Sequence, residues 1–283
     1  MKKTFVHLPQ PFLVAVVREK DPGSVNANIK NSEYDGADAY DLHINVLEKQ
    51  YRNPHDLGNI MSSTTRPVLL LNYRSDPQTT DAERAEEQLL GIRAGAAGID
   101  LIGDYFDPDR PVMTPQSLNE YSLTRGSKPL ELTENREELK RQRELIDQVH
   151  DLGGEVLLSS HTRVLMTTEQ VVPFALEMAS RGPDMIKIVT ICLNENDLVE
   201  AFRTIVELKK VMKIPFQYQC HGQHSKLLRV MGPMLGSALI FCNQQYKPGF
   251  HPDQPLLRAM RTVLQNVDWR VSRTEPGESL NLT

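Results

Sequence analysis

The chain has 283 residues, of which 40% are hydrophobic and 24% are charged, and its net charge is −5. This length suits one α/β barrel, and no apolar run approaches the roughly 18 residues that a transmembrane helix needs. The charges do not form a basic cluster, so we expect neither a nucleic-acid partner nor a membrane partner. The cysteines are odd in number and without paired spacing, which is typical of reduced thiols in a cytoplasm: Cys192, Cys220 and Cys242.

The N-terminal stretch has a basic pair and some apolar residues, but Pro9 and Pro11 interrupt it and no small-residue cleavage site follows. It is therefore interpreted as the approach to a first strand and not as a signal peptide. Beyond it, short apolar or β-branched runs alternate with longer amphipathic stretches. Eight such runs predict strands: 12–17, 37–44, 67–73, 98–103, 154–160, 184–190, 215–220 and 237–243.

Helices are predicted between several of these strands from residues that commonly cap helix N-termini. The expected starts are Asp81, Thr133 or Glu134, Thr168, and Asn194 or Glu195. Strands that are apolar on both faces and alternate with helices indicate a parallel sheet. Eight such units predict a (β/α)₈ TIM barrel that forms one domain over residues 1–283. A doubly wound sheet is the alternative, but no glycine-rich phosphate loop follows the first strand.

Residues 104–132 contain four prolines and little periodicity. A structureless stretch of this length is uncommon inside a compact domain, so we interpret it as an insertion after the fourth strand. A loop that follows a barrel strand leaves from the catalytic face. The insertion is therefore expected to cover the site or contact a second subunit, and a surface excursion without function is the alternative.

In a barrel, side chains at the carboxyl ends of the strands point into the active site. Several ionisable residues fall at these positions: Asp41, His43, Arg74, His161, Lys187 and His221. Lys187 lies between isoleucines in a strand that should be buried. Burial disfavours the ammonium form, and the neutral amine is the nucleophile that forms an imine with a ketone or aldehyde. The alternative for Lys187 is a structural pair with a buried carboxylate.

His161 ends the strand before that of Lys187. Adjacent parallel strands lie about 4.8 Å apart, so the two side chains can meet. A histidine beside an imine-forming lysine is a suitable proton shuttle. The alternative is a histidine that merely satisfies its hydrogen bonds at the end of a strand.

At this pair the sequence resembles the type I 3-dehydroquinate dehydratases. In that family a strand ends in an S-x-H-type sequence and the Schiff-base lysine follows in a K-[IV]-[AV]-type strand; here they correspond to GEVLLSSH (154–161) and DMIKIVT (184–190). Other family motifs are similar to GADAYDLHIN (36–45), LLLNYRS (69–75), LLRVMGPMLGSALIFC (227–242) and YKPGF (246–250). The match covers most of the chain apart from the insertion.

The resemblance implies a lyase that dehydrates 3-dehydroquinate to 3-dehydroshikimate, or acts on a closely related keto-polyol acid, with no cofactor and no metal. Lys187 would form the imine and His161 would move the proton. Arg229 would bind the substrate carboxylate and Arg74 a ring hydroxyl. The family is often dimeric, so a homodimer is one possible state. We expect a cytoplasmic enzyme of the shikimate pathway and of aromatic amino acid biosynthesis, although catabolism of quinate-like compounds is also open.

The chain departs from the family in the groups that grip the substrate. The family's E-x-R in the second strand is Asp41-x-His43 here, and its glutamate that orients the catalytic histidine aligns with Gln78. We therefore expect His161 to be less basic than in the family. Tyr246 and Phe250 replace the serine and glutamine beside the P-G turn. These five positions are retained as substrate-binding candidates.

Two other functions remain open. A divalent-metal isomerase or hydrolase could use His43, His161 and His221 with Asp41 as ligands. A sensor that keeps the fold and binds a shikimate-type ligand without turnover would explain the altered second strand. Lys187 has no role in the first alternative, and an imine has none in the second.

Overall fold

The computed structural model describes residues 4–74, 76–110, 129–222, 224–247 and 253–267. Within these residues eight parallel strands form one sheet in the order β7-β6-β5-β4-β3-β2-β1-β8. Their bounds are β1 Phe12–Val17, β2 Ala39–His43, β3 Val68–Leu71, β4 Gly98–Ile102, β5 Glu155–His161, β6 Met185–Ile191, β7 Phe216–His221 and β8 Leu239–Cys242. All eight predicted strands are thus confirmed.

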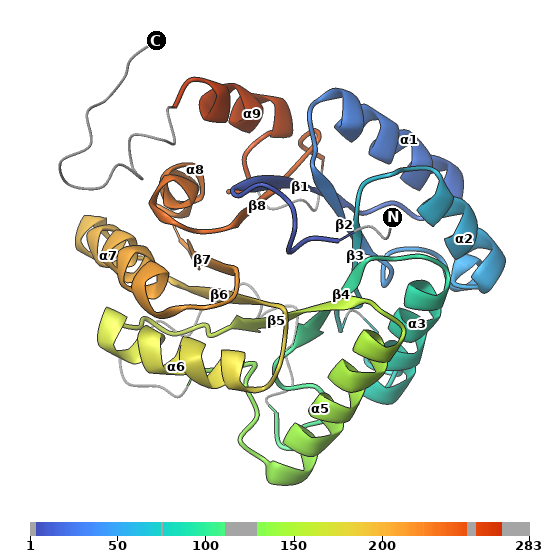
Figure 1. The fold of residues 1–283 in the computed structure, drawn as a ribbon, viewed down its shortest axis with the longest axis horizontal. Helices are drawn as coiled ribbons and strands as arrows, with labels where there is room; N and C mark the ends of the chain where they lie inside the picture. The colour runs from blue at the N-terminus through green and yellow to red at the C-terminus, as the bar shows by residue number, and fades with distance from the viewer. Residues whose placement is uncertain (1–3, 75, 111–128, 223, 248–252, 268–283) are drawn as a thin grey trace.

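The two ends of this sheet approach each other. The backbone nitrogen of Ala238, just before β8, donates to the carbonyl of Phe216 on β7 at 2.7 Å. The sheet is therefore a nearly closed ring, and the helices surround it (Figure 1). This arrangement is the (β/α)₈ barrel that the alternating pattern predicts.

The helices cover the outside of the ring and are numbered as in Figure 1. Their bounds are α1 Pro22–Tyr34, α2 Pro54–Ser62, α3 Asp81–Arg93, α5 Arg136–Asp151, α6 Thr168–Ser180, α7 Glu195–Val211, α8 Ser225–Leu235 and α9 Leu257–Gln265, with a 3₁₀ turn η1 at Lys49–Tyr51. Asn194 caps α7 as predicted, whereas Thr80, Asn135 and Thr167 cap α3, α5 and α6. The other predicted starts lie one or two residues away because a neighbouring side chain supplies the cap.

The buried apolar residues form two groups that separate the faces of the strands. The larger group lies between strands and helices, and the smaller one contains residues such as Val14, Leu157 and Met185. Since side chains alternate along a strand, the residue two positions after a member of the smaller group also faces the barrel interior. By this rule Ser159 and Lys187 face the interior, above its apolar floor.

The segment predicted as an insertion is described at both ends, 104–110 and 129–132, and its middle lies outside the described residues. Leu132 pairs with Gly103 in an isolated parallel bridge, and Leu130 N donates to Thr162 O at 3.0 Å. The returning chain is therefore fixed between the carboxyl ends of β4 and β5, at the catalytic face. Among the described helices, none is both long and apolar enough to cross a membrane.

Candidate active site

Lys187 lies in the middle of β6 with its side chain 7% exposed. Its Nζ donates to Asp100 Oδ2 on β4 at 3.0 Å, and Ser159 Oγ on β5 donates to the other oxygen of Asp100. Nζ also lies 5.0 Å from the centre of the Phe241 ring. The amine therefore sits in an apolar wall but has one buried carboxylate partner, which sequence analysis left open as an alternative without naming it.

His161 follows Ser159 on the same face of β5, at its carboxyl end. Its Nδ1 lies 2.7 Å from Glu131 Oε2, and its backbone nitrogen donates to the same oxygen at 2.9 Å. Tyr73 donates to Glu131 Oε1 at 3.0 Å and lies edge-on to the imidazole. With Nδ1 held by a carboxylate, Nε2 is the nitrogen left to exchange protons with a substrate.

Glu131 is a site residue that sequence analysis missed. It is 5% exposed, and its backbone has φ of 52°, a conformation that side-chain-bearing residues seldom adopt. Burial raises the pKa of Glu131, but the charge of His161 and the hydrogen bonds from it outweigh this and lower the pKa to about 2. Glu131 is therefore ionised and can stabilise an imidazolium.

This geometry corrects the expected role of Gln78. Gln78 is exposed in the turn before α3, where its backbone nitrogen donates to Asp76 Oδ1 at 2.9 Å. The carboxylate on His161 comes instead from Glu131, 30 residues before it in the chain. The expectation that Gln78 stands in place of the family's glutamate beside His161 is thus wrong, because the segment after β4 supplies the carboxylate that the loop after β3 lacks.

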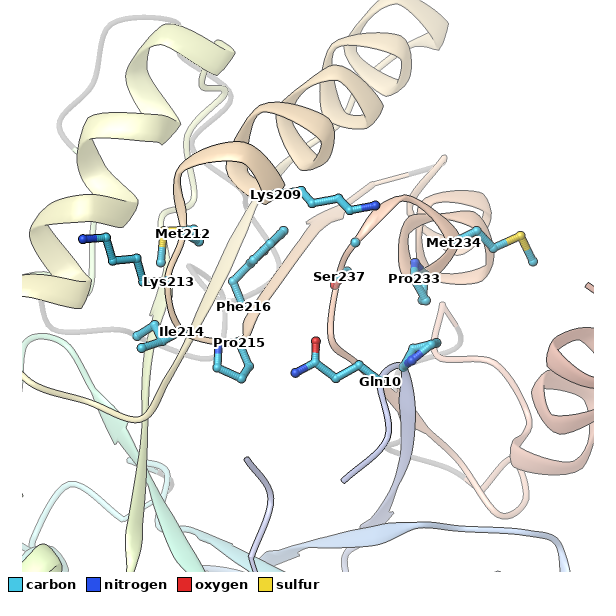
Figure 2. A pocket seen from close by; sticks show the side chains of 12 residues that line it. Gln10, Lys209, Met212, Lys213, Ile214, Pro215, Phe216, Pro233, Met234 and Ser237 are labelled. Atoms are coloured by element: carbon cyan, nitrogen blue, oxygen red, sulfur yellow. The ribbon is translucent and has the colours of Figure 1, made fainter. Parts of the chain in front are cut away.

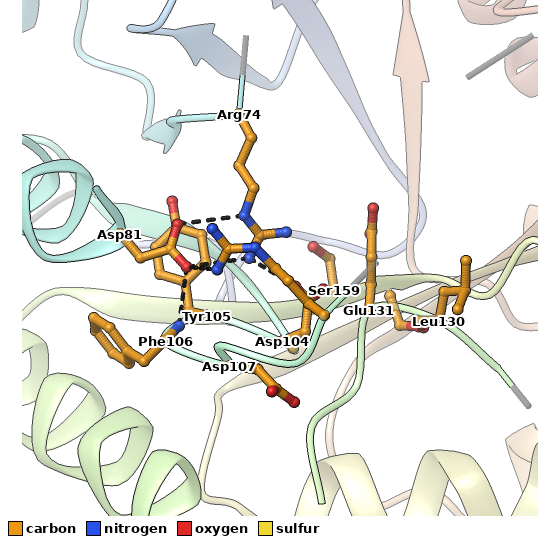
Figure 3. A network of polar contacts seen from close by, with 12 residues as sticks. Arg74, Asp81, Asp104, Tyr105, Phe106, Asp107, Leu130, Glu131 and Ser159 are labelled. Carbon is orange, nitrogen blue, oxygen red and sulfur yellow. Dashed lines mark hydrogen bonds and ion pairs between the residues drawn. The ribbon is translucent and has the colours of Figure 1, made fainter. Parts of the chain in front are cut away.

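Arg74 leaves the end of β3 and enters a network with two carboxylates (Figure 3). Its Nη2 lies 2.7 Å from Asp104 Oδ1, and its Nε lies 3.3 Å from Asp81 Oδ1. Burial lowers the pKa of Arg74, but the charges of Asp104 and Asp81 raise it above the ordinary value. Arg74 thus joins the segment after β4 to the start of α3. Its expected role, a contact with a ring hydroxyl of the substrate, did not anticipate these two carboxylate partners.

Arg229 on α8 has a side chain that is 2% exposed. Its Nε and Nη2 lie 3.2 and 2.8 Å from Asp253 Oδ2, and its Nη1 donates to Gln219 Oε1. Burial raises the pKa of Asp253, but the hydrogen bond from His221 and the charge of Arg229 hold it well below the usual range. The arginine expected to receive a substrate carboxylate is therefore paired with a carboxylate of its own chain.

Asp41 and His43 lie on the interior face of β2. His43 Nε2 is 3.2 Å from Asp41 Oδ2, whereas Asp41 Oδ1 is buried without a hydrogen-bond partner in the part of the chain that the structure describes. Gln217 Oε1 on β7 is likewise buried without a hydrogen-bond partner among the described residues. Buried acceptors normally have partners, so these two oxygens are suited to hydroxyl groups of a ligand.

His221 ends β7 and its ring stacks on that of His161 with 6.1 Å between the ring centres. Burial lowers the pKa of His221, and Asp253 opposes this effect. The three histidines and Asp41 do not form a metal-ligand set: within the described residues no group of three or more His, Cys, Asp or Glu side chains is placed to hold an ion.

The remaining candidates lie at the edge. Tyr246 is 48% exposed and its hydroxyl donates to Gln254 O at 3.2 Å, while Phe250 lies outside the described residues.

A cavity of about 390 Å³ opens elsewhere, beside the C-terminal end of α7 and the start of β7, where Lys209 and Phe216 line it (Figure 2). It lies at the amino ends of the strands, opposite to His161, and is not the candidate active site.

Comparisons with known proteins address the fold and the family. The structure resembles the 3-dehydroquinate dehydratase of Geobacillus kaustophilus (TM-score 0.72, 14% identity, 92% of each chain covered) and the type I enzyme of Clostridium difficile with covalently modified comenic acid (0.67, 16%, 94% of this chain and 98% of that one). The enzyme of Enterococcus faecalis gives 0.65 at 14% identity, over 92% and 95% of the chains. At these identities the likeness shows the barrel fold. No curated protein sequence matches the chain.

The family model of the type I 3-dehydroquinases matches residues 129–268. This part of the chain belongs to the type I 3-dehydroquinase family. The matched region includes Glu131, His161, Lys187 and Arg229, and it begins just before the first of them. Members of the family are lyases, and the resemblance seen at the lysine and histidine motifs is confirmed. Asp41, by contrast, lies in the part before the match.

Proposed function

We propose that the protein dehydrates 3-dehydroquinate to 3-dehydroshikimate through an imine on Lys187. One observation carries the proposal: a buried lysine in the barrel interior has a histidine–carboxylate pair at the end of the neighbouring strand, within the region that matches the family. The register pairs His161 with Val189, two residues beyond Lys187, so the histidine stands above the lysine at the mouth.

The first step is attack of Nζ on the substrate ketone. A carbinolamine forms, loses water and becomes a protonated imine, whose positive charge remains near the Asp100 carboxylate. Asp100 is suited to this step because it can take the proton that the ammonium must lose and return it to the hydroxyl group that leaves as water. As a carboxylate again, it then neutralises the iminium. Ser159 holds the carboxylate in place from the strand between.

The second step is elimination. The iminium draws electrons from the neighbouring carbon, so His161 Nε2 can remove a proton from that carbon, and the enamine expels the β-hydroxyl group. The same imidazole returns the proton to the leaving oxygen as water departs. Glu131 stabilises the intermediate imidazolium through Nδ1. Hydrolysis of the conjugated imine then frees the enone and Lys187.

The substrate hydroxyls are assigned to the interior acceptors Asp41 Oδ1 and Gln217 Oε1, and the carboxylate to Arg229. His43 acts through Asp41. That Arg74, Tyr246 and Phe250 contact the substrate stays a prediction. On the composition and the family resemblance, we also propose a cytoplasmic homodimer in the shikimate pathway, which light scattering coupled to size exclusion would test for its oligomeric state.

The test is borohydride reduction in the presence of 3-dehydroquinate, followed by peptide mass spectrometry, with the ultraviolet absorbance of the enone recorded in parallel. We expect a substrate-sized increment on the peptide that contains Lys187, together with growing absorbance. The increment without the absorbance would keep the imine and reject this substrate. If neither the increment nor the absorbance appears, the proposal is rejected. The carboxamide of 3-dehydroquinate and other keto-polyol analogues would then be tried as substrates.

A further inference from the structure

Asp253 lies in the loop after β8, shortly before α9. The backbone after it is fixed: Asn243 N at the end of β8 donates to Pro255 O at 2.9 Å, and Leu257 N donates to Asn243 O at 2.9 Å. Asp253 is thus held against the catalytic face by its own chain. Its side chain is 18% exposed, so it can turn toward solvent more easily than the buried arginine below it.

Among the described residues, the contacts of Asp253 use one oxygen, Oδ2. Oδ2 accepts hydrogen bonds from Arg229 Nε and Nη2 and from Ser225 Oγ at 3.2 Å, and His221 Nδ1 lies 3.8 Å from it. The Nε–Nη2 edge is one of the two edges at which a guanidinium binds a carboxylate through two N–H groups. Gln219 holds Nη1 on the other edge.

An incoming substrate carboxylate therefore meets an Arg229 whose Nε–Nη2 edge is already occupied by Asp253. It must displace Asp253 toward solvent or bind beside a second negative charge. Both routes cost free energy that an uncharged group in place of Asp253 would not impose. A substrate without a carboxylate would not meet this cost, because it would leave the pair intact.

We propose that Asp253 is a specificity-determining residue that competes with the substrate carboxylate for Arg229 and sets the affinity for acidic substrates. This inference rests on the proposed function for its physiological substrate. Asp253 touches no reacting atom in this arrangement, so its effect falls on binding and leaves the imine and elimination steps unchanged.

The experiment compares 3-dehydroquinate with its carboxamide on the wild-type protein and on Asp253→Asn. We expect the KM for the acid to fall about tenfold, with kcat changed less than about twofold and the KM for the carboxamide not lowered. Asp253→Ser is a second variant that removes the charge, and Asp151→Asn, at the exposed end of α5, is the matched control. An unchanged or raised KM for the acid in both variants would overturn the proposal.

A second measurement separates this result from failure of the proposed function. If the wild-type protein neither turns over 3-dehydroquinate nor forms a trapped imine, the binding of cyclohexanecarboxylate and cyclohexanecarboxamide is measured by calorimetry. Tighter binding of the acid to Asp253→Asn than to the wild type, without such a change for the amide, supports the competition. Equal binding of the acid to both proteins rejects it.

Discussion

The two sides of the barrel mouth contain the same kind of ion pair, a cation with a carboxylate, but the pairs have different functions. On the side of β4–β6, Asp100 and Glu131 face groups that become or stay positively charged in the proposed reaction, Lys187 and His161. On the side of β7–β8, Asp253 faces Arg229, which is expected to bind an anion. A carboxylate partner therefore helps where the cation reacts and competes where the cation binds.

The largest expected effect breaks the first side at its centre. Lys187→Met should lower kcat by about 10⁴-fold or more and abolish borohydride trapping, because the covalent route is lost. The substitution leaves Asp100 buried and unpaired, which costs about 3–5 kcal/mol of stability. The double variant Lys187→Met/Asp100→Asn removes that cost and should be folded but inactive. Lys210→Met, an exposed lysine paired with Glu207, is the control. Substantial turnover by the double variant would remove Lys187 from the mechanism.

Glu131 on the same side should have the next largest effect. Glu131→Gln keeps a hydrogen-bond acceptor near His161 but removes the charge that stabilises the imidazolium, so kcat should fall about 10²-fold with little change in KM. Glu144→Gln, on the exposed face of α5, controls for the loss of one carboxylate. A variant that matches the wild-type kcat would show that His161 does not need this partner.

The same variant gives a pH test with a defined direction. The pKa of Glu131 is lowered from 4.5 to about 2, so its contribution to stability is present above pH 4.5 and is lost as the pH falls through the folded value. The difference in the free energy of unfolding between the wild type and Glu131→Gln, on the order of 3 kcal/mol at neutral pH, should therefore shrink between pH 4.5 and 2. Chemical denaturation at several pH values measures it, and a difference that grows on acidification contradicts the assignment.

Sequence periodicity predicted the fold because the barrel repeats one local unit. Each strand has a mainly apolar outer face, and several helices begin at a side chain that caps them, so neighbouring residues suffice to place them. Lys187 and His161 could be identified for the same reason: each is a polar residue at a recognisable place on a strand. Helix starts shifted by a residue or two where adjacent residues could both cap, as with Thr80 and Asp81.

The partners of these residues could not be found locally. Glu131 and Asp253 lie in segments without periodicity, and only the folded chain brings them to residues 30 and 24 positions away. Asp100 did have a signal that was overlooked. It is a lone charge in the apolar segment GIDLIG, as Lys187 is in the strand MIKIVTI, and two opposite charges in nearby buried strands should be tested as a pair.

A smaller effect is expected on the substrate side. Asp41→Asn should raise the KM for 3-dehydroquinate about tenfold and change kcat less, because an interior acceptor for a ring hydroxyl is weakened while the imine site is untouched. Steady-state kinetics with Asp151→Asn as the control measure this. A loss confined to kcat would instead place Asp41 among the groups that act on the transition state.

The smallest expected effect concerns Gln78. Because this side chain is exposed and the carboxylate on His161 comes from Glu131, Gln78→Ala should leave kcat and KM within about twofold of the wild type. The sharper version is Gln78→Glu in the Glu131→Gln background. If the loop after β3 reached His161, the new glutamate would restore much of the lost kcat. Because Glu131, in the segment after β4, holds His161 in the structure, no recovery of kcat is expected. Recovery of activity in the double variant would instead place residue 78 beside His161.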